Sequence, residues 1–444
     1  MNSRERVKKA ISHELPDKVP FDLGSTTVTG IHAIAYGNLK RAFKLQGGMT
    51  KVYEPFQMLA EVEDSVRKAL GVDTFGIQLP YTPFGFKNED WKTWKMPDGT
   101  EVLVSGHFTF DLDRDGSILL YPQGDRSVPP SGRMPKDGFY FDNVIRQPPL
   151  RERDLDPREW VEQTCFLYTD EDLRYLEKLA AWAYGETEYS LVGILPEGSL
   201  GDIAVVPGPH IKFPKGVRDP EEWYVSFVKR KNYLQDIFGY QTELALKNLK
   251  GFHDAVGGRI DILDVSEADF GTQEGPLLSP KLFRELFKPF FRQMNDWVHK
   301  NTSWKTFYHS CGSIAELLED FIEMGADIIN PLQYRAAGMD LEFLKKEYGD
   351  RIVFWGGAVE TQRILPFGSP EEVRDEVIKN LEILSQKGGY VFASIHNIQP
   401  DVPGQNLKAM IETFNRWRES GRFAGRSGVE AFQKGNKAPE EGAK

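Results

Sequence analysis

The chain has 444 residues, of which 40% are hydrophobic and 27% charged, and its formal net charge is −11 at pH 7. This composition is typical of a soluble globular protein, and the acidic balance without a basic stripe argues against binding to nucleic acid or to an anionic membrane. No apolar run approaches the roughly 20 residues of a membrane span. Two cysteines, Cys165 and Cys311, make no disulfide framework, and the first residues lack the apolar core of a secretory signal, so we expect a cytoplasmic protein.

The first 80 residues predict alternating helices and strands. We expect a helix over 3–13, a strand over 18–25, a helix over 54–70 that stops at Gly71, and a strand over 72–80.

Residues 85–155 have a different texture. The run "WKTWKMPDGTEVLV" places a Pro-Asp-Gly turn between two extended stretches, which indicates a hairpin, and short aromatic runs with Gly and Pro follow it. We interpret this segment as a β-rich insertion and not as a separate enzyme domain.

After residue 170 the pattern is one of repeated strand–helix units. Strands are predicted over 189–199, 259–271, 304–312, 326–333, 351–359 and 388–399, and helices over 221–249, 279–300, 313–325, 341–349, 369–386 and 403–421. Ser279 and Pro280 are an N-cap and a first helical residue. Repeated units of this kind favour a parallel sheet covered by helices, and the strand count is close to eight. We therefore predict an α/β protein with a (β/α)8 TIM barrel as a single domain over 1–423, and a disordered tail over 424–444. The alternative is a doubly wound open sheet, but no strand is followed by a G-x-G-x-x-G loop.

In such a barrel the active site lies where strands end, so the polar residues at the predicted strand ends are the candidates. They are Asp22, Glu197, Asp264, Glu267, Asp269, His309, Cys311, Asn330, Gln333, Trp355 and His396.

His309 and Cys311 are two residues apart, so on an extended strand both side chains point to one face. Zinc accepts imidazole nitrogen and thiolate sulfur, and a catalytic site takes three protein ligands. His396 is the best placed third ligand. A helix starting near Ser313 would lower the pKa of Cys311 toward the thiolate. The alternative interpretation is that Cys311 is a small buried hydrophobe and His396 an acid–base or hydrogen-bonding histidine. Cys165 and the other histidines are expected to be structural or solvated.

Four stretches resemble the uroporphyrinogen decarboxylase superfamily: "RERVKKAISHELPDKVPFD", "HSCGSIAELLEDFIEMGADIINPLQ", "FWGGAVETQRILPFGSPEEVRDEV" and "NIQPDVPGQNLKAMIETF". The resemblance covers the first 80 residues and most of 170–420, and it implies a (β/α)8 barrel. One branch of this superfamily is the metal-free decarboxylase, which holds its tetrapyrrole with an arginine-rich N-terminal motif, "RQAGR". The corresponding strand here is "VPFDLGSTTVTG", without arginine, which argues against uroporphyrinogen as substrate.

The other branch is the zinc methyltransferases that move methyl groups to or from a corrinoid protein, with the signature H-x-C and a later cysteine. The sequence "HSC" is similar to the first element, whereas His396 stands where the later cysteine is expected. The resemblance therefore implies a catalytic zinc held by His309, Cys311 and His396, with Asp269 as a fourth ligand or a partner of one. Glu197, Glu267, Asn330, Gln333 and Trp355 would bind the substrate, a small methylated compound or a thiol.

No corrinoid-binding motif is visible in the chain, so a partner protein would supply that cofactor. Two other hypotheses stay open: a metal-free lyase that decarboxylates another acid with His396 and Asp269, and a barrel that binds a tetrapyrrole or corrinoid without turnover. The 85–155 segment could be a lid, a docking surface or a dimer contact, and an exposed apolar helix face would allow a homodimer.

Overall fold

A curled parallel sheet of seven strands forms the centre of the computed structural model, which describes residues 1–421. The strands are β3 (Thr74–Ile77), β10 (Ser190–Ile194), β11 (Ile262–Ser266), β12 (Lys305–His309), β13 (Ile328–Asn330), β14 (Val353–Trp355) and β15 (Tyr390–Val391). Their order in the sheet follows their order in the chain. A doubly wound sheet reverses its strand order at a switch point, so this order excludes that alternative.

The predicted strand over 18–25 is reduced to a single bridge that joins the two edges of the sheet. Phe21 pairs in parallel with Phe392, directly after β15. Its carbonyl oxygen accepts a hydrogen bond of 2.7 Å from the backbone N–H of Asp73, directly before β3. The result is a TIM-barrel-like α/β fold. The predicted tail over 424–444 lies outside the described residues.

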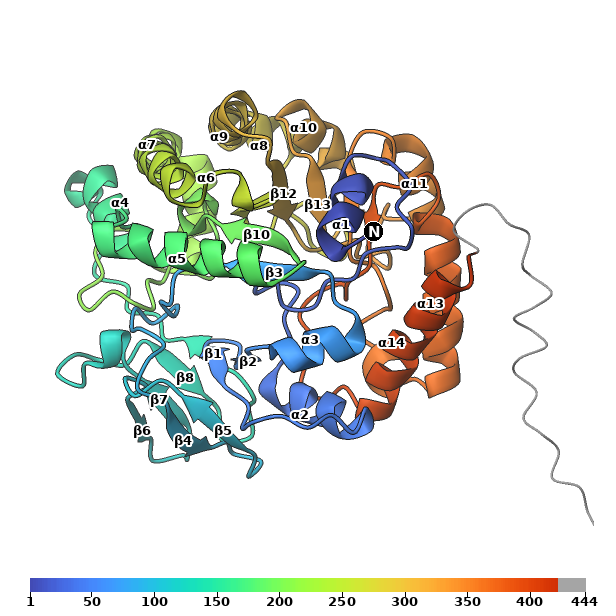
Figure 1. The fold of residues 1–444 in the computed structure, drawn as a ribbon. Helices are drawn as coiled ribbons and strands as arrows, with labels where there is room; N and C mark the ends of the chain where they lie inside the picture. The colour runs from blue at the N-terminus through green and yellow to red at the C-terminus, as the bar shows by residue number, and fades with distance from the viewer. Residues whose placement is uncertain (422–444) are drawn as a thin grey trace, which may run out of the picture.

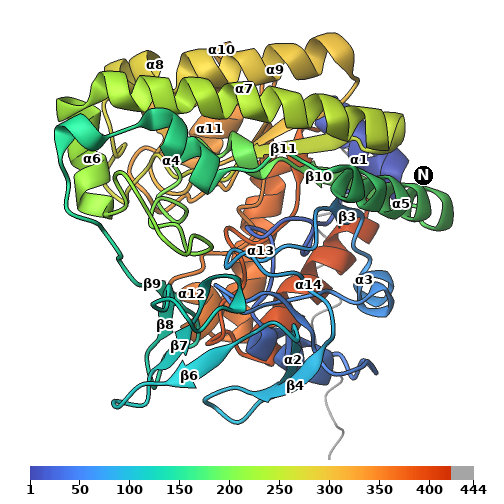
Figure 2. The ribbon, with the colours of Figure 1, turned by 90° about the vertical axis from the view of Figure 1, so that its left-hand side faces the viewer.

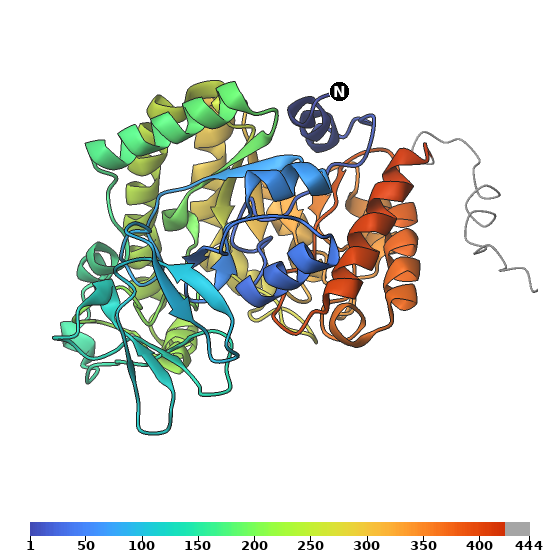
Figure 3. The same cartoon turned by 60° about the horizontal axis from the view of Figure 1, so that its bottom comes forward.

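The outer layer consists of helices that follow the strands, and Figures 1 and 3 show them on the outside of the sheet. The helices are α1 (Ser3–Ile11), α2 (Ala33–Ala42), α3 (Asp64–Leu70), α4 (Pro157–Thr164), α5 (Asp170–Glu186), α6 (Pro220–Lys229), α7 (Lys231–Val256), α8 (Pro280–Leu286), α9 (Lys288–Asn301), α10 (Leu318–Glu323), α11 (Leu341–Tyr348), α12 (Ile364–Phe367), α13 (Pro370–Leu384) and α14 (Gly404–Glu419). Within residues 1–421, none of the helices combines the length and the apolar character that crossing a bilayer requires.

Helix α1 closes the end of the barrel at which the strands begin. Its Val7 and Ala10 are fully buried in one apolar cluster with Val192, Ile262 and Phe307 from three strands. This packing leaves the opposite end, where the strands finish, as the end at which a site can form.

The segment between β3 and β10 is rich in antiparallel strands, as predicted, and Figure 2 shows it below the barrel. The predicted hairpin is confirmed, because β4 (Lys92–Lys95) pairs with β5 (Glu101–Val104) across the Pro-Asp-Gly turn. A second sheet contains β6 (Phe110–Leu112), β7 (Ile118–Leu120), β8 (Gly132–Met134) and β9 (Asp142–Asn143).

The helix predicted over 54–70 is wrong in its first half. Residues 52–60 form a small antiparallel pair, β1 (Val52–Glu54) and β2 (Leu59–Ala60), and only α3 is helical. The Glu54 carboxylate accepts the backbone N–H groups of Phe56 and Gln57, both at 2.8 Å. Local bonds of this kind compete with the helical hydrogen bonds.

The helix predicted over 279–300 begins as expected but is broken in two. The Ser279 side chain accepts a hydrogen bond from the backbone N–H of Leu282, which confirms the N-cap. Helix α8 ends before Phe287, and α9 begins at Lys288 with Pro289 in its first turn. Proline has no N–H to donate to the preceding turn, so the helix cannot continue through it.

Trp355 ties β14 to the bridging N-terminal segment, because its indole N–H donates to Asp22 Oδ2 at 2.9 Å. Trp355 is only 1% exposed. Replacing it with phenylalanine removes a buried bond to a charged group, so we expect Trp355→Phe to lower the free energy of unfolding by about 2 kcal/mol. Urea denaturation measures this loss. The control is Trp182→Phe on α5, where the tryptophan is 48% exposed, and an equal loss in both variants would contradict the prediction.

Candidate metal centre

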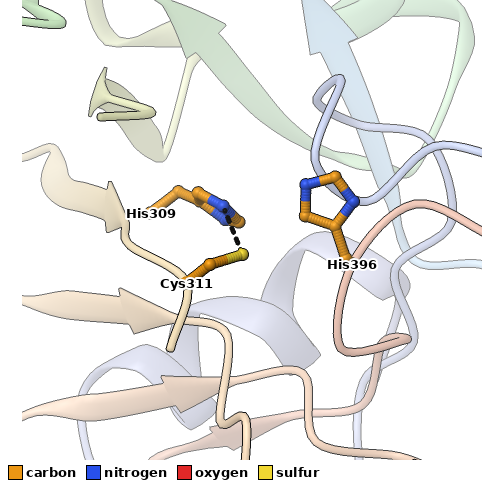
Figure 4. Close-up of side chains that lie close together, drawn as sticks. All are labelled: His309, Cys311 and His396. Atoms are coloured by element: carbon orange, nitrogen blue, oxygen red, sulfur yellow. Dashed lines mark hydrogen bonds between the residues drawn. The ribbon is translucent and has the colours of Figure 1, made fainter. Parts of the chain in front are cut away.

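His309, Cys311 and His396 meet at the end of the barrel where the strands finish (Figure 4). His309 is the last residue of β12, Cys311 follows two residues later, and His396 lies in the loop after β15. His309 Nε2 lies 3.3 Å from Cys311 Sγ. The rings of His309 and His396 have centroids 5.3 Å apart, and the ligand atoms of all three residues lie within 4.8 Å of one another.

A neighbouring amide orients the His309 ring. Asn330 Nδ2 donates to the carbonyl oxygen of Trp355 at 2.9 Å, so Asn330 Oδ1 is the acceptor on its other side. His309 Nδ1 lies 2.6 Å from that Oδ1 and must therefore carry a proton. Because Nδ1 donates its proton to Asn330, the other ring nitrogen, Nε2, is the one that faces Cys311 and could bind a metal.

Asp269 approaches the same residues from the loop after β11. Its Oδ1 accepts the backbone N–H of Cys311 at 2.6 Å and lies 3.5 Å from His309 Nε2. Its side chain is 42% exposed, so this carboxylate lies at the open side of the group.

Two glycines bring the β11 and β12 loops this close. A Cβ on Gly312 would lie 2.5 Å from the carbonyl carbon of Gly271, and a Cβ on Gly271 would lie 2.5 Å from the carbonyl oxygen of Cys311. Gly312 also has a φ of +83°. Only glycine satisfies both the contact and the conformation at this position.

The expectation of a lowered pKa for Cys311 is wrong for the structure as it stands. Burial raises the pKa of the Cys311 thiol, and the attraction of His309 offsets only part of that effect. The helix expected near Ser313 begins as a 3-10 turn at Ala315–Leu317 and becomes α10 only at Leu318. The positive end of that helix is therefore too far away to stabilise a thiolate, because a helix dipole acts over about one turn.

The two histidines have opposite electrostatic environments. Burial disfavours the charged form of His309, but Cys311 and Asp269 attract it more strongly, so its pKa is raised well above the ordinary value. The pKa of His396 is lowered to about 4, first by burial and then by repulsion from His309. A neutral imidazole is the form that binds a metal, and His396 is held in that form at neutral pH.

The donor set matches the chemistry of catalytic zinc. Two imidazole nitrogens and one sulfur are ligands that zinc accepts, with a fourth position left for water or substrate. Tetrahedral bonds of ordinary length put sulfur and nitrogen about 3.5 Å apart, close to the 3.3 Å between Cys311 Sγ and His309 Nε2.

Of the predicted substrate-binding residues, Glu267 and Gln333 have part of their surface exposed. The Glu267 carboxylate accepts a hydrogen bond of 2.7 Å from the Thr27 hydroxyl. Asn330 has its amide bound within the protein, Gln333 accepts the backbone N–H of Gly312 at 2.7 Å, and Trp355 is buried against Asp22. These residues hold the framework of the site.

Glu197 is buried in the 3-10 turn Pro196–Gly198, which packs against α7. Its Oε2 accepts the Tyr168 hydroxyl at 3.1 Å, and its backbone carbonyl accepts Gln241 Nε2 at 2.9 Å. The substrate contact predicted for Glu197 stays a prediction.

Some residues near the site were not predicted from the sequence. Glu54, Asp202, Tyr53 and Tyr224 interact electrostatically with Glu267 or Asp269. Glu54 is the first residue of the helix that was wrongly predicted, Tyr53 precedes it, and Asp202 lies in an irregular loop, so no periodic signal marked these three residues.

Two other places in the chain have residue types that can react or bind a metal: Cys165, and the set Glu89, Asp90 and His107. The pKa of the Cys165 thiol is raised strongly by burial, as expected of an unreactive core cysteine. Glu89, Asp90 and His107 also place ligand atoms close together, but all three are exposed on the β-rich segment.

Comparison with known proteins gives the following similarities. Residues 214–417 match the family model of uroporphyrinogen decarboxylase (URO-D). The uroporphyrinogen decarboxylase of Chlorobium phaeobacteroides is 28% identical over 141 residues, which are 30% of this chain and 37% of that protein. The uroporphyrinogen decarboxylase of Chlorobaculum tepidum is 31% identical over 99 residues, which are 22% of this chain and 26% of that protein. The chain therefore matches well under half the length of these relatives.

A solved structure, a methyltransferase from Methanosarcina mazei, has a similar fold, with a TM-score of 0.52 and 15% sequence identity. The alignment covers 94% of this chain and 99% of that chain. The likeness of fold thus extends over nearly the whole chain, whereas the sequence match is confined to part of it.

The buried Glu197 predicts a pH-dependent stability. Burial is the main reason why its pKa is raised from 4.5 to about 7. The folded state binds this proton more tightly than the unfolded state, so the protein loses stability as pH rises from 4.5 to about 7, by about 3 kcal/mol in all. The variant Glu197→Gln has no proton to lose. Its free energy of unfolding relative to wild type should therefore rise over this range and be constant above it.

Urea denaturation at four pH values between 5 and 8 measures this difference. Glu186→Gln, at an exposed position at the end of α5, is the control and should show no such trend. A difference for Glu197→Gln that does not change with pH would contradict the prediction.

Proposed function

We propose that the protein is a zinc-dependent methyltransferase that moves a methyl group between a small methylated substrate or thiol and a corrinoid. The observation that carries this proposal is the group of His309, Cys311 and His396, which converge from two strand ends. The URO-D match and the fold shared with a methyltransferase support it, because the same fold supports that reaction class in another protein. A partner protein would carry the corrinoid and dock where the strands end.

Zinc bound in this group would act as a Lewis acid on the sulfur, oxygen or nitrogen that gains or loses the methyl group. Residues of the chain would have separate tasks. His309, Cys311 and His396 hold the ion, and Asn330 keeps His309 Nε2 directed at it. Asp269 fixes the loop that carries Cys311 through the backbone N–H bond, and its carboxylate is near enough to His309 to contact a bound ligand.

The second candidate is a metal-free decarboxylase, which the similarity to curated uroporphyrinogen decarboxylases supports. In that reaction His396 and Asp269 would transfer the proton. The charge of the site argues against a substrate with several carboxylates, because Glu267 and Asp269 lie at the same end of the barrel and would repel it.

The zinc content of purified, untagged protein tests the leading proposal. We expect about one zinc per chain in wild type, and loss of that zinc in both Cys311→Ser and His396→Ala, measured by mass spectrometry. Cys165→Ser is the matched control, since it removes the other cysteine of the chain, and it should keep its zinc. Wild-type protein without zinc after growth in ample metal would contradict the proposal and favour the lyase. Methyl transfer from methylcobalamin to a panel of thiols separates an enzyme from a barrel that only binds a corrinoid.

The role of Asn330 gives a second test. Without its side chain, His309 loses the acceptor that fixes its ring, so Asn330→Ala should weaken zinc affinity about 10- to 100-fold. Competition with a chromophoric chelator measures this change. The control is Asn380→Ala, because Asn380 is equally buried and donates to the carbonyl oxygens of Gly357 and Ala358, away from the ligands. Equal weakening in the two variants would show that the effect is one of general stability.

A further inference from the structure

His396 lies in a stretch of four residues, 394–397, which we name the His396 loop. The backbone on either side of it is anchored. The carbonyl oxygen of Ala393 accepts a backbone N–H from the loop after β14 at 3.1 Å, and the N–H of Ile398 donates to the carbonyl oxygen of Gly30 at 3.0 Å. In the part of the chain that the structure describes, none of the backbone groups of 394–397 forms a hydrogen bond with another backbone group. Side chains must therefore hold the loop that carries this metal ligand.

Asn397, the residue directly after His396, supplies this support. It is 1% exposed. Its Nδ2 donates to Gln57 Oε1 at 2.6 Å, and its Oδ1 accepts a hydrogen bond from Gln399 Nε2. A displacement of the His396 loop would break at least one of these bonds, and it is costly to leave a buried amide without its partner.

Gln57 lies in the turn between β1 and β2, and this turn is held by its own hydrogen bonds. The backbone N–H groups of Phe56 and Gln57 donate to the two carboxylate oxygens of Glu54, both at 2.8 Å. Glu54 is only 4% exposed, so water competes little for these bonds. The turn therefore holds the backbone of Gln57 in one place before its side chain reaches Asn397.

The same hairpin is also bonded to the β-rich segment between β3 and β10. Asn88 Nδ2 donates to the carbonyl oxygen of Tyr53 at 2.6 Å, and the backbone N–H of Phe141 donates to the carbonyl oxygen of Phe56 at 2.8 Å. Figure 1 shows β1 and β2 beside the strands of this segment, and β1 packs against β5. Gln57 is thus an anchored residue to which the His396 loop is attached.

Different parts of the chain therefore position the two histidines of the metal-ligand group. His309 is oriented inside the barrel by Asn330, which bonds to its ring. His396 is carried by a loop whose support comes from the β1–β2 hairpin. The ring centroids of the two histidines are 5.3 Å apart. Metal–ligand distances vary by only about 0.2 Å between good sites, so a small shift of one ligand changes the geometry around the ion.

We propose that Gln57 is a positioning residue for His396, and that it acts through its bond to Asn397. The inference rests on the metal site of the proposed function but not on the methyl transfer itself. Gln57 would not touch the ion or the substrate. Its loss would leave all three metal ligands in the chain, and only the position of one of them would change.

Titration of the metal-free full chain with Co²⁺ tests the proposal without any methyl donor or acceptor. Co²⁺ binds imidazole and thiolate ligands, and its visible absorption depends on the number and geometry of those ligands. We expect Gln57→Ala to weaken Co²⁺ binding about tenfold and to change the visible bands. The near-ultraviolet band from the Cys311 thiolate to Co²⁺ should persist. Gln57→Glu keeps an oxygen that accepts the N–H of Asn397, so it should restore the wild-type visible spectrum.

Gln147→Ala is the matched control. Gln147 is partly buried like Gln57, and its Oε1 accepts the backbone N–H groups of Arg218 at 2.6 Å and Asp219 at 2.8 Å, outside the His396 loop. This variant should bind Co²⁺ with the affinity and the spectrum of wild type. An equal change in Gln147→Ala and Gln57→Ala would show a loss of general stability and overturn the inference.

Asn397→Ala removes the same bond from its other side, so a folding defect at position 57 alone would not decide the test. It should change the visible bands as Gln57→Ala does, and the double variant should lose no further affinity. Additive losses would contradict an action through this bond.

The remaining outcomes separate this inference from the proposed function. A wild-type chain that binds Co²⁺, with an unchanged spectrum in Gln57→Ala, would overturn the inference and leave the metal site in place. A changed spectrum in a chain whose zinc form transfers no methyl group would uphold the inference and refute the proposed function. A wild-type chain that binds no Co²⁺ would overturn both.

Discussion

The hydrogen bond between His309 Nδ1 and Asn330 Oδ1 is the constraint on which the site depends. It joins the last residues of two neighbouring strands, β12 and β13, inside the barrel. Asn330 in turn donates to the backbone of Trp355 at the end of β14, so three adjacent strands fix the direction of one imidazole nitrogen. A histidine held in this way loses little conformational freedom when it binds a ligand, which is the condition for a precise metal site.

The second constraint is the close contact between the loops after β11 and β12. Gly271 and Gly312 allow their backbones to approach more closely than any side chain permits, and Asp269 is thereby held against the N–H of Cys311. Gln333 secures the same loop from β13 by accepting the N–H of Gly312. The position of the sulfur thus depends on these backbone contacts. The cysteine is fixed in place while burial keeps its pKa high, and binding of a metal would supply the charge that lowers it.

The elements predicted well from the sequence are those with strong local signals. Ser279 caps its helix as its position before Pro280 indicates, and the strands from β10 to β14 lie in the order of the chain. The pair His309 and Cys311 could be predicted because an i, i+2 spacing on a strand is a local property. His396 required the assumption that strand ends converge, which is a property of the barrel.

Other features depend on contacts that no local pattern reveals. Glu54 uses its carboxylate for its own turn, so an amphipathic run that favours helix became a hairpin. Asp202 joins the site from an irregular loop. Trp355 and Asn330 are polar residues at strand ends, which made them candidates for substrate contact, but their partners across the barrel bind the groups that a substrate would need. Position at a strand end therefore predicts proximity to the site and not the role within it.

The residues that hold the strand ends in place are different from the residues that would carry out the reaction, and this separation explains how one barrel can support different reactions. Asn330, Gln333, Trp355 and Asp22 satisfy one another and the backbone, so they could hold many kinds of site. Only three residues would determine the reaction in the proposed site. They are His309 at the end of β12, Cys311 two positions later, and His396 after β15, three strands away. A fold shared at 15% identity therefore says little about the molecule that is bound.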